Sequence, residues 1–279
     1  MRVPSTQSTS IAVHDLGGDG PALLVCHATG FCGGAYRPLA AELAPHHRVF
    51  AVDMRGHGES TPPADGDFAW SGMADDVAAT AAAIAEVAPG PLHVVGHSMG
   101  GAAALLAEHR RPGTFASAYL YEPIVPPRTA PDDASVGNPL AQGARFRQEV
   151  FPSRAEALWR YAARTPLGIL RADALAAYAE HGFEDVEDGK VRLRCRREHE
   201  ALTFEGAGAV HAGLFGDLAL RTTVAVGGTD PGMVADFAPA LAAVLPHATL
   251  EPHPTLGHFG PLQDPVTVAA AIVVHTTAG

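Results

Sequence analysis

A serine held between two glycines is the feature that most constrains how this chain can fold. Ser98 lies between Gly96 and Gly100, after an apolar run at 92–95 and before a run of small residues at 102–106. A strand, a tight turn and a helix are predicted in that order. The pattern G-x-S-x-G in this setting is typical of a nucleophile elbow, where the serine backbone is strained and side chains at the glycines would clash with the crossing strand and helix. An ordinary glycine-rich turn is the alternative interpretation.

Five segments of the chain resemble motifs of the α/β-hydrolase family, in the family's order and at its usual spacing. They are residues 27–31, 53–60, the elbow at 96–101, 227–230 and 256–259. The resemblance covers nearly the whole length and identifies the chain as similar to a serine hydrolase of that fold. It implies an α/β fold with a mostly parallel sheet covered by helices on both faces. It also implies a mainly helical cap, inserted after the strand that ends at Glu122.

Strand-like and helix-like stretches alternate along the chain, lapse after residue 124, and resume near residue 214. We therefore predict a core in two parts, 1–124 and 214–279, separated by a cap insertion at 125–213. Within the cap, the residue pattern predicts helices over 140–150, 154–164, 172–181 and 198–204. Asp188-Gly189 is a strong two-residue turn signal, so a hairpin is expected there.

One long helix of the core is predicted to begin at Ser71 and to run to about residue 87. Ser71 is expected to cap its N-terminus. Asp75 and Asp76 then lie in the first turn, where the positive end of the helix dipole favours anions.

The composition limits the partners of the protein. The chain has 279 residues and a net charge of −11 at pH 7, which argues against a groove for nucleic acid, because such a groove needs clustered Lys and Arg. Cys26, Cys32 and Cys195 form no evident disulfide framework. The sequence shows no stretch typical of a signal peptide and no apolar run of about 18 residues. We therefore expect a cytoplasmic protein without a membrane partner.

The resemblance implies a catalytic triad. A serine hydroxyl needs a base to attack at neutral pH, and the base needs an acid that fixes its tautomer. The family's order of serine, acid and histidine gives Ser98, Asp230 and His258. Glu122 is the alternative acid, because some haloalkane-dehalogenase-like members take the acid from the strand that follows the elbow. Asp230 also has a plainer interpretation, as a turn or helix-capping aspartate.

Two backbone N–H groups are expected to form an oxyanion hole. By position in the family, the donors are Thr29, in the loop after the first buried parallel strand, and Met99, directly after the serine. Ala28 stands where the family usually has glycine, a change that leaves the backbone N–H groups of the loop in place.

Four residues are expected to line a substrate pocket because they adjoin the catalytic positions in the sequence. They are His27, Phe31, Tyr36 and Phe259. For His27, the favoured interpretation is a histidine that holds the loop by hydrogen bonds rather than a second base.

No cofactor or metal is expected. Asp53, His57 and Glu59 are residue types that ligate metals, but the same series is a routine bracing loop in the resembled family.

The residues favour a serine hydrolase that cleaves a carboxylic ester or lactone of a small to medium apolar molecule. A carbon–carbon bond hydrolase, a thioesterase and a non-catalytic ligand-binding member of the same fold are the alternatives. For a thioesterase, the basic run at 192–197 is a modest candidate for a docking patch. Serine at position 98 disfavours epoxide hydrolases and haloalkane dehalogenases, which use aspartate there. The oligomeric state is left open.

Overall fold

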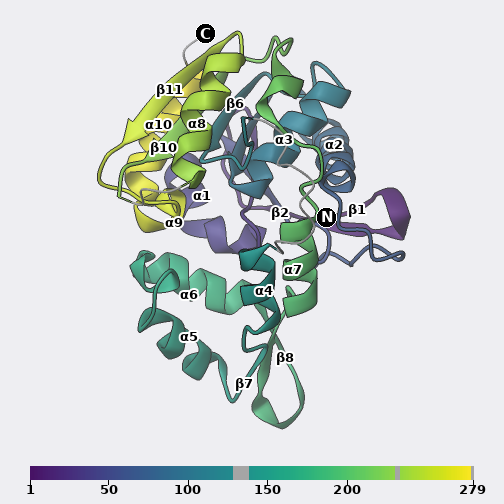
Figure 1. Ribbon diagram of the computed structural model, residues 1–279, viewed down its shortest axis with the longest axis vertical. Coiled ribbons are helices and arrows are strands. Elements are labelled where there is room, and N and C mark those ends of the chain that lie inside the picture. The colour runs from purple at the N-terminus through teal and green to yellow at the C-terminus, as the bar shows by residue number, and fades with distance from the viewer. Residues whose placement is uncertain (128–137, 230–232, 278–279) are drawn as a thin grey trace.

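The computed structural model describes residues 1–127, 138–229 and 233–277, and its largest element is an eight-stranded sheet (Figure 1). The strand order is β1-β2-β4-β3-β5-β6-β10-β11. Strands β1 and β2 run antiparallel to their neighbours, and the remaining pairs are parallel. The strands are β1 (Arg2–Pro4), β2 (Ser10–Asp15), β3 (Ala22–Cys26), β4 (Arg48–Val52), β5 (Leu92–His97), β6 (Ser117–Tyr121), β10 (Thr222–Gly227) and β11 (Ala248–His253). This confirms the predicted α/β fold with a mostly parallel sheet.

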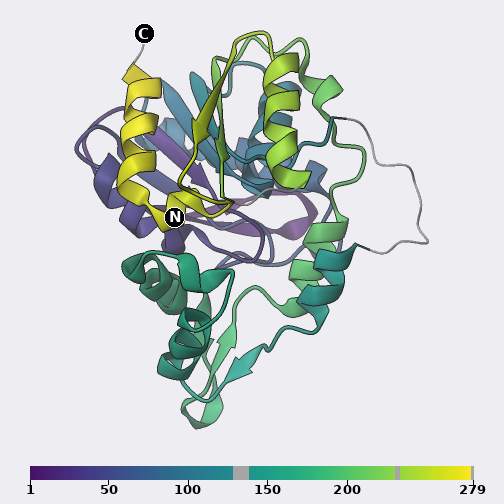
Figure 2. The same cartoon turned by 60° about the vertical axis from the view of Figure 1, so that its left-hand side comes forward.

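Helices cover both faces of the sheet (Figure 2), which explains why β3, in its middle, is apolar along its whole length. In β3, Leu24 packs into one core, and Leu23 and Val25 pack into the other. The helices on the first face are α2 (Trp70–Val87), α3 (Met99–Arg110) and α8 (Met233–Val244), and those on the second are α1 (Arg37–Leu43) and α10 (Pro265–Thr277). The short helix α9 (Gly260–Gln263) precedes α10.

The chain between β6 and β10 contributes a separate layer, drawn below the main sheet in Figure 1. We call its residues 138–205 the insert. Its elements are α4 (Pro139–Arg145), β7 (Val150–Phe151), α5 (Arg154–Ala162), α6 (Ala172–His181), β8 (Phe183–Asp185), β9 (Val191–Leu193) and α7 (Arg197–Glu205). The predicted hairpin is confirmed, because β8 and β9 pair antiparallel on either side of a turn at Glu187–Gly189.

The insert differs from its expected form in one respect. The first helix ends at Arg145 rather than near residue 150, because the chain there becomes β7, and β7 pairs with β9 in a small three-stranded sheet. The boundaries at 125 and 213 stay predictions, and residues 128–137 lie outside the described part of the chain.

Helix α6 docks the insert onto the core. It packs against the short 3₁₀ helix at Gly33–Tyr36, and a Cβ at Gly34 would collide with the ring of His181. The Tyr178 hydroxyl donates a hydrogen bond to the Gly30 carbonyl at 3.3 Å, and its ring lies 5.0 Å from that of Phe31. The insert therefore lies directly over the loop that follows β3.

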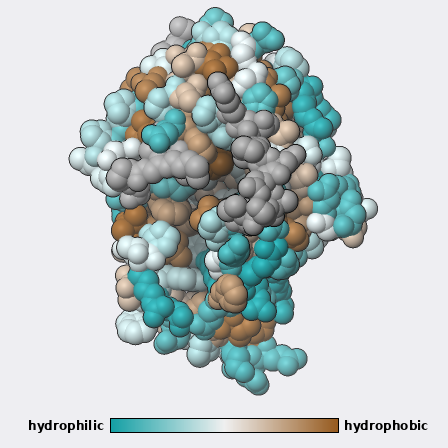
Figure 3. Space-filling view, viewed as in Figure 1, coloured by the Kyte–Doolittle hydropathy of each residue, from teal (hydrophilic) through white to brown (hydrophobic). Residues whose placement is uncertain are grey.

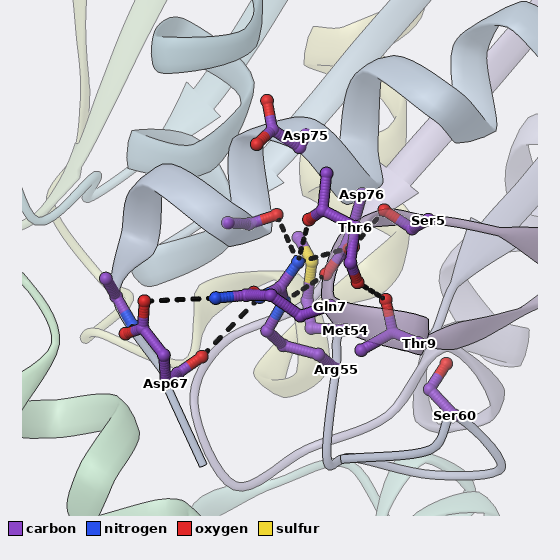
Figure 4. Close-up of polar contacts among 12 residues, drawn as sticks. Ser5, Thr6, Gln7, Thr9, Met54, Arg55, Ser60, Asp67, Asp75 and Asp76 are labelled. Carbon is purple, nitrogen blue, oxygen red and sulfur yellow. Dashed lines mark hydrogen bonds and ion pairs between the residues drawn. The ribbon is translucent and has the colours of Figure 1, made fainter. Parts of the chain in front are cut away.

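A buried ion pair joins helix α2 to the loop after β4, and N-terminal residues bond to both of its partners (Figure 4). Arg55 Nε donates to Asp76 Oδ2 at 2.6 Å, and neither side chain is exposed. The Ser5 hydroxyl donates to the same carboxylate, and Thr6 accepts a bond from the Arg55 guanidinium at 3.0 Å. Helix α2 begins at Trp70 without a side-chain cap, so the prediction that Ser71 caps it is wrong. Asp76 serves this ion pair rather than the helix terminus.

We expect Asp76→Ala to lower the free energy of unfolding by roughly 3–5 kcal/mol, because it leaves the Arg55 guanidinium buried without its counter-charge. Asp75 is a matched control, since it pairs with Arg110 at 2.9 Å where the two side chains are 31% and 45% exposed. Asp75→Ala is expected to cost less than about 1 kcal/mol. Urea denaturation of both variants measures the difference, and equal losses would contradict this interpretation.

The visible surface in Figure 3 is a mixture of hydrophilic and apolar residues, with hydrophilic ones prominent over the lower part of the molecule. Within residues 1–127, 138–229 and 233–277, no helix has both the length and the apolar character needed to span a bilayer.

Candidate active site

The elbow has the strained geometry that its glycines predict. Strand β5 ends at His97, α3 begins at Met99, and Ser98 between them has φ 57° and ψ −121°. A Cβ at Gly96 would lie 2.5 Å from the Cα of Gly101. A Cβ at Gly100 would overlap the Cys26 carbonyl at the end of β3. Glycine is therefore required at both positions, and Ser98 lies where the carboxyl end of β5 meets the N-terminus of α3.

The two expected oxyanion donors lie beside this turn. Met99 is the first residue of α3, and Thr29 belongs to the loop after β3. Among the described residues, neither backbone N–H donates to a protein acceptor. An N–H group without a protein acceptor is free to donate to a ligand, as an oxyanion donor must.

His258 lies in the loop after β11 and bonds to Glu122. Its Nδ1 lies 2.6 Å from Glu122 Oε2, and Glu122 Oε1 accepts a 2.8 Å hydrogen bond from the backbone N–H of Gly227. Because an ionised carboxylate only accepts, Nδ1 carries the hydrogen and donates it. Glu122 is 2% exposed and follows β6 with a positive φ of 42°. The carboxylate is thus buried and oriented by two donors.

Glu122, the alternative acid weighed from the sequence, contacts His258. Asp230, the preferred acid, lies outside the described residues, which stop at Thr229 and resume at Met233.

A chain of hydrogen bonds links the elbow, the His258 loop after β11 and the loop after β3. We call the last of these, which contains Thr29, the oxyanion loop. His97 Nε2 donates to the carbonyl of His258 at 2.8 Å, and His97 Nδ1 accepts from the Tyr36 hydroxyl at 2.6 Å. The Tyr36 oxygen in turn accepts from the Ala28 N–H at 3.1 Å. Burial lowers the pKa of His97 well below its ordinary value, so the ring is neutral, as this pattern of one donor and one acceptor requires.

His27 and Tyr36 were expected to line a pocket, but neither side chain reaches the cavity between the core and the insert. Both are fully buried, and the Tyr36 hydroxyl is committed to its hydrogen bonds with Ala28 and His97. His27 Nδ1 donates to the Ala28 carbonyl, and its Nε2 accepts from the N–H of Met54. Adjacency in sequence misled here because these two side chains point into the core beneath the loop.

Phe31 and Phe259 do line a cavity, of about 540 Å³, between the core and the insert. Their rings lie 5.5 Å apart. Thr29 belongs to the same wall, so the cavity reaches the oxyanion loop. The insert supplies most of the remaining wall, much of it apolar, including Leu140 and Phe204.

Sequence reasoning missed a polar cluster in the insert. Arg147 donates to Glu200 Oε2 at 2.8 Å and to the hydroxyls of Tyr161 and Tyr178. Burial opposes the charge of Arg147, but Tyr178 and Glu200 raise its pKa well above the ordinary value. A Cβ at Gly30 would lie 2.5 Å from Glu200 Oε1. The cluster therefore packs directly against the oxyanion loop at Gly30, although none of its members belongs to a sequence motif.

The loop that follows β4 braces the core. Asp53 accepts hydrogen bonds from the N–H groups of Gly33 and Glu59, at 2.7 and 2.8 Å, and contacts His14 Nε2 at 2.8 Å. Burial opposes ionisation of Asp53, yet these bonds, His14's foremost, hold its pKa below the ordinary value. His57 Nδ1 donates to the Arg55 carbonyl at 3.0 Å.

Solved structures share this architecture. An E-2-(acetamidomethylene)succinate hydrolase superposes with a TM-score of 0.79 at 22% identity, covering 100% of this chain and 98% of the other. A thermophilic esterase from Thermogutta terrifontis gives a TM-score of 0.72 at 23% identity, covering 98% and 96% of the two chains. At these identities the likeness concerns the fold alone.

Curated relatives match over part of the chain. A pimeloyl-[acyl-carrier protein] methyl ester esterase of Methylococcus capsulatus is 36% identical over 103 residues, which are 37% of this chain and 37% of the relative. Protein phosphatase methylesterase 1 of Bos taurus is 33% identical over 102 residues, 36% of this chain and 27% of the relative. The chain thus aligns with well under half the length of these two relatives.

A sequence profile described as the alpha/beta hydrolase family matches residues 23–271. That span includes the elbow, the loop after β3, the insert and the His258 loop. The sheet order, the strained serine and the profile agree, and the chain belongs to the alpha/beta hydrolase family.

Proposed function

We propose that the protein is a serine hydrolase that cleaves a carboxylic ester or lactone of a small to medium, mainly apolar molecule through an acyl-enzyme on Ser98. The observation that carries the proposal is the 2.6 Å contact between His258 Nδ1 and the buried Glu122 carboxylate, in a loop that His97 holds beside the elbow. A histidine oriented by a carboxylate next to a strained serine is the arrangement that acyl transfer needs.

In the proposed reaction, Glu122 accepts the hydrogen of His258 Nδ1 and stabilises the imidazolium that forms. His258 Nε2 removes the proton of Ser98 as its Oγ bonds to the substrate carbonyl carbon. The same proton then passes to the leaving alkoxide as the ester C–O bond breaks. Water, deprotonated by His258, releases the acyl group as a carboxylic acid and restores Ser98. No cofactor is needed to balance these steps.

The N–H groups of Thr29 and Met99 are the proposed oxyanion donors. Each is expected to contribute roughly 3 kcal/mol, because a fixed donor aimed at a developing charge needs no reorganisation during the reaction. The cavity lined by Phe31 and Phe259 is the proposed site for the apolar part of the substrate. The choice of an ester is supported by the two curated relatives, whose names are both those of methyl esterases.

Active-site labelling tests the proposal. A fluorophosphonate should form one adduct, on the peptide that contains Ser98, and hydrolysis of p-nitrophenyl butyrate should fall in step with labelling. If the enzyme still hydrolysed p-nitrophenyl butyrate after the fluorophosphonate had fully labelled Ser98, Ser98 would not be the nucleophile. A labelled enzyme that hydrolyses no short or medium ester before labelling would instead favour a non-catalytic binding role.

A further inference from the structure

The wall of the cavity carries an excess of positive charge. Its charged residues, within the described part of the chain, are Arg147, Arg160, Arg164 and Glu200. Three guanidinium groups thus accompany one carboxylate, in a chain whose net charge is −11. A concave wall with an excess of positive charge concentrates anions, even in a protein whose net charge is negative.

Arg147 does not account for this excess, because Glu200 neutralises it and two tyrosine hydroxyls accept its other N–H groups. The unbalanced charges are Arg160, in the last turn of α5, and Arg164, four residues later. Neither side chain forms an ion pair or a hydrogen bond with another residue that the structure describes. Both guanidinium groups are therefore available to a ligand in the cavity.

The rest of the wall selects what kind of anion fits. Aromatic and aliphatic side chains make up most of it, among them Phe31, Phe151 and Leu167. A free inorganic ion gains nothing from such a surface, whereas an apolar chain that ends in a charge satisfies both parts. The guanidinium fork matches the two oxygens of a carboxylate.

We propose that the preferred substrates are esters whose cavity-bound arm is apolar and ends in a carboxylate, held by Arg160 and Arg164. This inference rests on the proposed hydrolase function and adds the substrate class to it.

Matched pairs of esters test the substrate class. Monomethyl adipate and methyl hexanoate differ only in whether a carboxylate or a methyl group ends the acyl arm. The acetate ester of the corresponding ω-hydroxy acid and hexyl acetate make the same comparison on the alcohol arm. In one of the two pairs, kcat/KM is expected to favour the carboxylated ester, and added NaCl is expected to reduce the preference through screening.

Substitutions test whether Arg160 and Arg164 cause the preference for the carboxylated ester. In Arg160→Gln/Arg164→Gln, the ratio of kcat/KM for the carboxylated and neutral esters should fall about tenfold, as expected when charge-assisted contacts are lost. Arg111→Gln/Arg197→Gln is the matched control, because both arginines are exposed and neither lines the cavity. It removes the same two positive charges from the protein and should change the ratio less than about twofold.

The possible failures are distinguishable. If the neutral esters are hydrolysed with no carboxylate preference, or the preference survives in the double variant, this inference is wrong and the hydrolase function stands. If Ser98 takes no label and none of the four esters is hydrolysed, both proposals are wrong.

Discussion

Ser98→Ala is expected to lower kcat for p-nitrophenyl butyrate by about 10⁴-fold or more. Removing the hydroxyl removes the atom that forms the acyl-enzyme, and only binding and the oxyanion donors remain to accelerate attack by water. The fold should persist, because no described side chain or backbone group bonds to the Ser98 hydroxyl and alanine adds no atoms. Steady-state kinetics measures the loss, and the melting temperature checks the fold.

Ser71→Ala is the control for this variant. Ser71 is an exposed serine in α2 that does not line the cavity, and its replacement should leave hydrolysis unchanged. If Ser98→Ala kept more than about one hundredth of the wild-type kcat, another residue would be the nucleophile and the proposed acyl-enzyme would be wrong.

The elbow, the buried strands and the hairpin were predictable because short stretches of sequence are enough to indicate them. Gly96 is required by the backbone of Gly101, which the turn itself brings close, and Gly100 by the Cys26 carbonyl at the end of the neighbouring strand β3. Because every such elbow makes this same approach, a pattern of five residues is enough to indicate it. The fully apolar run of β3 likewise predicts a strand buried on both faces. The sheet and the hairpin at Asp188-Gly189 follow from signals of this kind.

Contacts between distant segments were not predictable in the same way. Asp76 fits a helix N-terminus when only its neighbours are considered, yet its partner is Arg55, which is 21 residues away in the chain and comes from another element. Arg147 and Glu200 are separated by 53 residues in the insert, and neither has a local pattern that marks it. Only the packing of α6 and α7 around the oxyanion loop makes these residues part of one cavity wall.

The choice of the triad acid depends on such a contact. Strands β6 and β10 are neighbours in the sheet, so a carboxylate at the end of either one projects toward the same edge. The sequence alone shows both Glu122 and Asp230 at such ends. Glu122 accepts hydrogen bonds from His258 and from Gly227 on the adjacent strand. These two contacts favour Glu122 as the acid in our proposal.

Glu122→Gln is therefore expected to reduce kcat by about 10³- to 10⁴-fold. The amide keeps the size of the side chain, and its oxygen can still accept the N–H of Gly227, so the strand end should hold its shape. The amide carries no charge to stabilise the imidazolium of His258, and its NH₂ group cannot accept a hydrogen from Nδ1. Steady-state kinetics with p-nitrophenyl butyrate measures the effect.

Asp230→Asn makes the decisive comparison, because it applies the same isosteric change to the acid that the family's chain order favours. If Glu122 is the acid, this variant should lose less than about tenfold in kcat, and Ser98 should still react with a fluorophosphonate at nearly the wild-type rate. In Glu122→Gln the labelling rate should fall together with kcat, because activation of the serine depends on His258. A severe loss in Asp230→Asn with an active Glu122→Gln would reverse the assignment and make Glu122 an anchor for the Gly227 loop alone.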